Sequence, residues 1–213
     1  MGMTTEMKIR VYSSGEMFRH GTRLDSALQM LNTFNNVYTY CINKCVRKVE
    51  KSEIFLFNPE INVEYIKRGS LSSLLTVDFP AAYAMVSPWI SSNSWDLFKK
   101  TIEFAKAYIG TFRRNRGVPT MNIQDSPNST NIFLAVVGDG TINVGKDVVD
   151  SFNYNKSNLS SLAGNIGASM ADIFDVKHVD SKNTLKVIDK IRIDNSNSND
   201  LIIEEKEVLD DDV

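Results

Sequence analysis

One long amphipathic segment constrains the fold more than any other feature of this sequence. Apolar residues recur at spacings of three and four between residues 24 and 45, as they do along one face of a helix. Just before this segment, Thr22 and Asp25 form a Thr-x-x-Asp box that can cap a helix N-terminus. The stripe consists of Leu24, Leu28, Leu31, Phe34, Tyr38, Cys41, Ile42 and Cys45. The pattern predicts a long helix that needs a second layer to bury this face.

Segments with the pattern of β-strands lie on both sides of this helix. Residues 7–12 alternate apolar and polar side chains with a period of two. After the helix, residues 54–57, 61–67 and 71–77 are separated by turn-forming clusters and indicate a meander. The order predicts an α+β fold, in which a small antiparallel sheet carries the long helix on one face.

A second long helix is expected after Phe79 to Ser91, which we interpret as a short, irregular helical piece broken before Pro88. Ser92, Asn93 and Ser94 offer a cap for the second helix. An apolar seam follows at helical spacing, made of Trp95, Phe98, Ile102, Ala105, Ile109 and Phe112. Such a seam needs a partner helix, either within the chain or in a second chain. We take it as the candidate interface, although so short a seam rarely holds a dimer alone.

Composition divides the chain into an N-terminal domain, residues 1–116, and a C-terminal region, residues 132–208. The segment between them, 117–131, contains two prolines among Asp, Ser and Asn residues and is the predicted linker. Residues 209–213 are expected to form a solvated acidic tail.

The C-terminal region begins with the clearest hairpin pattern of the chain. An apolar run over 132–137 is followed by Gly138-Asp139-Gly140-Thr141, a sequence typical of a tight turn. A helical segment is expected over 146–174, and strands over 184–193 and 201–208. The predicted fold therefore continues with a helical region and a further β-hairpin/helix segment.

The net charge of -2 hides a strong asymmetry. Up to Arg116 the chain carries 16 Lys+Arg against 10 Asp+Glu, and after it 8 against 16. These opposite charges either offset each other within one monomer or guide head-to-tail association. The basic cluster at Lys44, Arg47, Lys48 and Lys51 is expected to be solvated surface. A pI near 5.7 and the acidic second half argue against a dedicated nucleic-acid-binding protein.

No membrane span or signal peptide is expected. The least polar stretch, residues 71–90, is interrupted by Asp78, Pro80 and Pro88. The first residues lack the basic and apolar regions of a signal peptide. The only two cysteines, Cys41 and Cys45, have helical spacing and are expected to be reduced thiols. These features together predict a cytoplasmic protein.

A candidate anion site lies before the first helix. His20, flanked by Arg19 and Arg23, is placed beside the expected helix-terminal amides, where an anion is favoured. Asp139, in the glycine-containing turn, is a further candidate contact for a nucleotide or metal. The ordinary alternatives are a capping or surface role for His20 and a plain hairpin turn at Asp139.

No catalytic constellation, metal site or cofactor site is predicted. A zinc site would need Cys41 and Cys45 together with both histidines, His20 and His178, whereas the cysteines lie on an apolar helix face. Two carboxylate pairs at helical spacing, Asp147 with Asp150 and Asp172 with Asp175, lack an accompanying hydrolase motif. We therefore expect a non-enzymatic protein, with an unrecognised hydrolase as an alternative.

The N-terminal pattern resembles that of a family of uncharacterised bacterial proteins. The resemblance rests on the strand, the Ser-Ser-Gly-Glu turn, Arg19-His20, Leu24-Asp25 and the long helix, and on Gly138 to Val144. It implies a bacterial or phage-borne protein with an N-terminal β-α-β-β-β domain and carries no known activity. An accessory role in antiviral defence or on a mobile element is the hypothesis that this resemblance suggests.

The leading functional hypothesis is a module that self-assembles or docks on a partner protein through the Trp95 to Phe112 seam and the charge asymmetry. The alternative is a sensor of a nucleotide or another anionic small ligand that uses Arg19, His20 and Arg23. The first hypothesis predicts a homo-oligomer or a bound partner protein.

Overall fold

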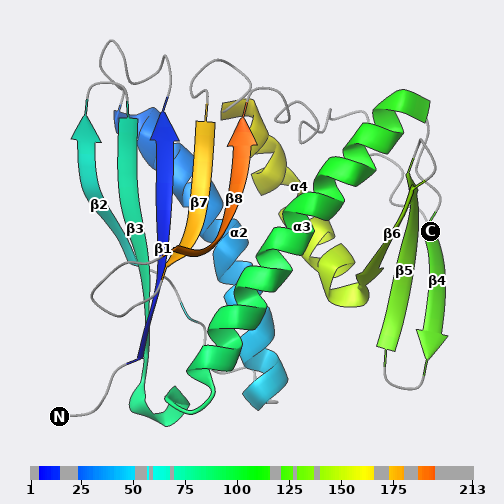
Figure 1. The fold of residues 1–213 in the computed structure, drawn as a ribbon, viewed down its shortest axis with the longest axis horizontal. Helices are drawn as coiled ribbons and strands as arrows, with labels where there is room; N and C mark the ends of the chain where they lie inside the picture. The colour runs from blue at the N-terminus through cyan, green and yellow to red at the C-terminus, as the bar shows by residue number, and fades with distance from the viewer. Residues whose placement is uncertain are drawn as a thin grey trace.

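A computed structural model of the chain describes residues 5–14, 24–50, 57, 60–67, 70–115, 121–126, 129–136, 140–165, 173–179 and 187–194. Its elements are β1 (Thr5–Ser14), α2 (Leu24–Glu50), β2 (Glu60–Lys67), β3 (Ser70–Phe79), η1 (Ala81–Tyr83), α3 (Ser87–Asn115), β4 (Met121–Ser126), β5 (Ser129–Val136), β6 (Gly140–Gly145), α4 (Lys146–Asn165), β7 (Ile173–Val179) and β8 (Val187–Asp194). Figure 1 shows a five-stranded sheet at one end and a three-stranded sheet at the other, with α3 and α4 between them.

The five-stranded sheet has the order β2-β3-β1-β7-β8, and every neighbouring pair is antiparallel. In β1, Ile9 and Val11 are buried and alternate with partly exposed residues, as the period-two pattern predicts. Ile9 pairs with Leu75 of β3, which is also buried. Figure 1 shows α2 behind this sheet. The predicted α+β fold, with a long helix on a small antiparallel sheet, is confirmed.

Two details of this sheet differ from the sequence-based expectation. Phe57 lies outside any strand, and residues 54–56 are not described, so the paired part of the expected meander is the β2-β3 hairpin. Ile173 and Phe174, expected in a helix, begin β7. The segment IFDVKHV has no regular alternation, and its pairing with β1 on one side and β8 on the other makes it a strand.

The expected linker contains regular structure. Met121 to Ser126 form β4, and β5 begins at Ser129, so these residues are paired strands. The hairpin that the sequence predicts is present as β5 and β6, with residues 137–139 between them not described. Because β7 and β8 join β1, the five-stranded sheet takes strands from both sides of the expected linker. Of the two expected C-terminal strands, β8 lies within 184–193 apart from its last residue, and 201–208 is outside the described residues.

Helix α2 forms the centre of the core. The apolar stripe that predicts it is buried from Leu31 onward, whereas Leu28 remains partly exposed. Rings from two helices meet there, since Phe98 of α3 lies edge-on to Phe34 at 5.1 Å and to Tyr38 at 5.6 Å between ring centroids. Edge-to-face contacts of this kind add to the stabilisation from apolar burial. The first sheet, α2 and α3 thus share one core.

Helix α3 begins earlier than the serine cluster suggests. It starts at Ser87, and Pro88 lies in its first turn, where a missing N–H costs no intrahelical hydrogen bond. The Ser87 hydroxyl donates to the carbonyl of Ala84 at 3.2 Å. Ser94, expected near a cap, is instead a buried helical residue whose hydroxyl lies 3.1 Å from the Tyr38 hydroxyl. The expectation of a helix start at 92–94 is therefore wrong.

Helix α4 packs against both α2 and α3. Its buried residues include Val148, Phe152 and Leu159, and the Phe152 ring lies edge-on to Phe104 of α3 at 5.3 Å. Its polar buried residue Asn155 donates to the carbonyl of Ser151 at 2.8 Å. Among the described helices, none has both the length and the apolar character needed to cross a membrane.

Candidate functional site

The predicted anion site cannot be placed from the structure. Arg19, His20, Arg23 and Asp139 all lie outside the described residues, as does the capping residue Thr22. The proposed roles of these residues stay predictions.

The seam on α3 is part of the core rather than a free surface. Trp95, Phe98, Ile102 and Ala105 are all less than 5% exposed within the monomer. The partner that their spacing requires is internal, because α3 packs against α2 and α4. The structure does not describe the side chains of the last two residues of the seam, Ile109 and Phe112. The assignment of the first four residues to an intermolecular interface is therefore wrong, since burying them already stabilises the monomer.

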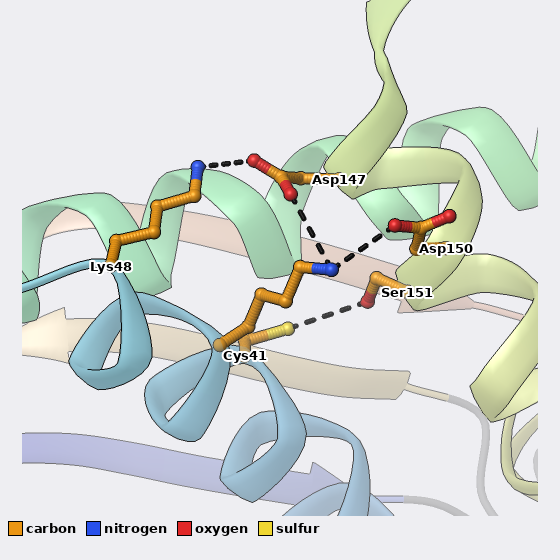
Figure 2. A network of polar contacts seen from close by, with 6 residues as sticks. Cys41, Lys48, Asp147, Asp150 and Ser151 are labelled. Carbon is orange, nitrogen blue, oxygen red and sulfur yellow. Dashed lines mark hydrogen bonds and ion pairs between the residues drawn. The ribbon is translucent and has the colours of Figure 1, made fainter. Parts of the chain in front are cut away.

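The two cysteines are buried thiols in contact with the core. Burial raises the pKa of Cys41 to about 12 and that of Cys45 to about 11. The Cys41 sulfur lies 3.7 Å from the Ser151 hydroxyl of α4 (Figure 2). Both are free of a disulfide, and no cluster of three potential metal ligands occurs among the described residues. A thiol with so high a pKa is a poor nucleophile at neutral pH.

A polar network joins α2 to α4 beside these thiols. Lys44 donates to Asp150 at 3.1 Å and lies 3.5 Å from a carboxylate oxygen of Asp147, which also pairs with Lys48. Figure 2 shows both aspartates on α4 turned toward α2. Partial burial lowers the pKa of Lys44, but the hydrogen bond to Asp150 and the neighbouring negative charges outweigh it, so the pKa is raised. The network contains two cations and two anions, and its charges offset each other.

A pocket of about 460 Å³ opens next to this network. Its lining comes from one stripe of α2 and from one turn of α4: Asn36, Thr39, Tyr40, Asn43, Lys44, Arg47, Tyr154 and Asn158. Tyr40 and Tyr154 stack across the two helices, with 4.3 Å between ring centroids and 23° between ring planes. Burial raises the pKa of Tyr40 despite the opposing effect of Lys44. The size lies within the range of small-molecule sites.

Two hydrogen bonds between the Asn43 side chain and the Phe57 backbone hold one side of the pocket. The amide of Asn43 donates to the carbonyl of Phe57 at 3.1 Å and accepts from its backbone N–H at 2.8 Å. Phe57 is itself buried, with its ring 5.2 Å from Tyr83. Both polar ends of Asn43 are therefore occupied, so this residue positions the pocket wall.

The three-stranded sheet presents a second surface of interest. By register, Ile123, Ile132 and Val144 form one row across its strands, and Met121, Leu134 and Ile142 form the next row. Residues directly opposite in antiparallel strands share a face, so one face of this sheet is apolar. The helices cover it unevenly: Val144 of β6 is 7% exposed, whereas Met121 and Ile123 of β4 are 39% and 64% exposed.

Strand β4 is also an edge strand with no charge over its first four residues. Met121, Asn122, Ile123 and Gln124 are all exposed, and β4 pairs only with β5 in the described structure. The edge strands of the other sheet differ, because β2 carries Glu60 and Lys67 and β8 carries Lys190 and Arg192. Charged side chains are a common protection of sheet edges against pairing with another chain. Strand β4 lacks that protection where its apolar side chains are exposed.

Comparison with known proteins does not assign the chain to a family. No protein-family model matches it, and no curated protein matches its sequence.

Sequence reasoning missed both surfaces for identifiable reasons. Lys44 and Arg47 were interpreted as solvated surface, and Asn36 and Asn43 precede them on the polar side of the first helix. Asn36, Asn43 and Arg47, at spacings of seven and four residues, share one face of the helix, but the partner turn of α4 does not appear in that pattern. Residues of β4 were assigned to a linker because prolines flank this short strand.

Proposed function

We propose that this protein is a self-assembling module in which β4 of one copy pairs with β4 of a second copy. The observation that carries the proposal is the exposed edge of β4, which has no charge over its first four residues, with Ile123 64% exposed on the apolar face of its sheet. Pairing would join two three-stranded sheets into one of six strands and satisfy the free backbone groups of both edges.

The sequence of β4 suits an antiparallel pairing about a two-fold axis through Asn122. In that register Met121 of each copy lies opposite Ile123 of the other, which gives two apolar cross-strand pairs. The exposed apolar residues of one edge are therefore matched by those of the other copy.

The test is the solution mass of the purified protein over micromolar concentrations, by light scattering and sedimentation. We expect a dimer that the Ile123→Lys variant converts to a monomer, because the substitution places a charge in the centre of the paired edge. Met85→Lys is the matched control. Met85 is 94% exposed and precedes the first residue of α3 by two positions, and the start of α3 lies far from β4 (Figure 1), so this variant should remain a dimer. A wild-type protein that is monomeric over the whole range would overturn the proposal.

A cysteine cross-link tests the register. In Asn122→Cys the two introduced thiols face each other across the two-fold axis, so mild oxidation should yield a covalent dimer. The native thiols do not interfere, because Cys41 and Cys45 are buried and have raised pKa values. Asn153→Cys, exposed on α4, serves as the control and should remain monomeric under denaturing electrophoresis. Equal cross-linking of both variants would contradict the proposed register.

A further inference from the structure

The pocket between α2 and α4 has polar groups of two kinds. One set is already engaged: Lys44 by two aspartates, Asn43 by the backbone of Phe57, and Asn158 by the side chain of Asn155 at 3.4 Å. These groups build and hold the walls.

The other set of polar groups lines the pocket and makes no hydrogen bond or ion pair with the described residues. Among the described residues, Asn36, Thr39 and Arg47 make no side-chain hydrogen bond or ion pair with the protein, although all three line the pocket. An amide offers both a donor and an acceptor, a hydroxyl offers the same, and a guanidinium offers five donors with a fixed positive charge. Since Lys44 and Lys48 are offset by Asp147 and Asp150, Arg47 is the cation of the lining that remains for a ligand.

The stacked tyrosines supply a flat apolar surface between these groups. One face of Tyr154 lies against Tyr40, and Tyr154 remains 68% exposed, so ring surface is open to solvent. The stacked rings leave apolar surface exposed to solvent, and a planar ligand such as a nucleobase would cover it by stacking on the open ring face.

The spacing along α2 sets the shape of such a ligand. With a helical rise of 1.5 Å per residue, Asn36 lies about 6 Å from Tyr40 along the axis, and Arg47 lies about 10 Å beyond Tyr40 on the opposite side. Hydrogen-bonding groups and a flat surface therefore occupy one end of the pocket, and an unneutralised cation occupies the other. A planar, hydrogen-bonding ring joined to an anionic group fits this order.

We infer that the pocket is a binding site for a nucleoside monophosphate. Its base stacks on Tyr154 and exchanges hydrogen bonds with Asn36 and Thr39, and its phosphate is bound by Arg47. The site is distinct from the predicted anion site at Arg19, His20 and Arg23, and it is independent of the β4 edge.

Titration calorimetry with AMP, adenosine and ribose 5-phosphate tests the inference on the full chain. We expect AMP to bind at least tenfold more tightly than either fragment, because only AMP uses both ends of the pocket. Arg47→Gln and Tyr154→Ala should each weaken AMP binding by tenfold or more. Tyr154→Phe, which keeps the ring, should recover most of the affinity that Tyr154→Ala loses. Lys100→Gln, at an exposed cation on α3, should bind as the wild type does.

Arg47 and Tyr154 are both exposed on their helices, so the Arg47→Gln and Tyr154→Ala variants are expected to fold. Far-ultraviolet circular dichroism checks this. Unchanged AMP affinity in both Arg47→Gln and Tyr154→Ala would overturn the assignment and direct attention to Arg19 and Arg23. Absence of AMP binding by the wild type at millimolar concentration would also overturn it. The Ile123→Lys variant should bind AMP normally, which separates this test from that of self-assembly.

Discussion

The two sheets of this protein have the same local pattern and different surroundings. In the five-stranded sheet, the apolar residues Ile9, Val11, Leu75 and Val77 are all buried in the core that α2 and α3 share. In the three-stranded sheet, coverage by α3 and α4 ends before β4, and Ile123 stays exposed. An apolar face therefore shows that a surface is suited to burial, and only the surrounding elements show whether the monomer itself supplies the cover.

The largest expected effect comes from removing an aromatic ring from the core that the five-stranded sheet, α2 and α3 share. Phe98→Ala deletes the side chain that contacts both Phe34 and Tyr38, and it should lower the free energy of unfolding by about 3–5 kcal/mol. Urea unfolding followed by circular dichroism measures the change. Met85→Ala, at an exposed site, should stay within about 0.5 kcal/mol. A loss below 1 kcal/mol at Phe98 would mean that this core is loosely packed.

Alkaline pH should lower the free energy of unfolding, because two buried thiols lie in the core. The folded pKa values of Cys41 and Cys45, about 12 and about 11, exceed the ordinary value of 9.0. The stabilisation from keeping these thiols protonated is complete below pH 9 and is lost as the pH rises toward 11 and 12, by at most about 1.4 kcal/mol per pH unit for each group. Unfolding free energies measured at several pH values should show this slope.

The double variant Cys41→Ala/Cys45→Ala isolates the thiol contribution. Its stability should fall less steeply between pH 9 and pH 11 than that of the wild type, although burial also raises the pKa of Tyr38 and leaves part of the slope. Identical slopes would show that the two thiols do not determine the alkaline loss.

A pair of substitutions compares the two ends of the three-stranded sheet. Val144→Ala, at the covered end, should cost about 1–3 kcal/mol of unfolding free energy. Ile123→Ala, at the other end of the same row on β4, should cost at most about 0.5 kcal/mol when the protein is dilute enough to be monomeric. Equal losses at the two sites would remove the basis for treating β4 as an open edge.

The smallest expected effect concerns the polar network that holds α4 against α2. Lys44→Met removes the shared partner of Asp147 and Asp150 and should cost about 1 kcal/mol at low salt, with a smaller loss in 0.5 M NaCl because exposed carboxylates are screened. Lys100→Met breaks only the exposed pair with Asp96 and should cost about 0.3–0.5 kcal/mol. Thermal unfolding at two salt concentrations distinguishes the two. A salt-independent loss at Lys44 would indicate that its aliphatic chain, rather than its charge, stabilises the contact.

Sequence reasoning succeeded where one periodic signal dominates a long segment. Helix α2 follows directly from its apolar stripe, and β1 from its alternation, because local periodicity and tertiary burial agree there. It failed at α3, where Pro88 was taken as a break although the first turn of a helix tolerates proline. It failed again at β4, a short strand flanked by prolines that pairs with the adjacent β5, and at β7, whose partner β1 is distant in the sequence.

The candidate sites were harder to predict for a related reason. The pocket needs Tyr40 of α2 and Tyr154 of α4 to meet across more than a hundred residues of chain, and no local pattern encodes that meeting. The seam of Trp95 and Phe98 has the spacing expected of a helix interface, but spacing alone does not distinguish an internal partner from an external one.

The central position of β1 has a consequence for biosynthesis. This strand leaves the ribosome well before one of its two neighbours, β7, which begins only at Ile173. Until that residue emerges, the nascent chain can pair β1 with β3 alone and exposes the other edge of β1 to solvent. Pairing between such distant segments slows folding and prolongs exposure to aggregation. Completion of the first sheet thus waits until β7 and β8 have been synthesised.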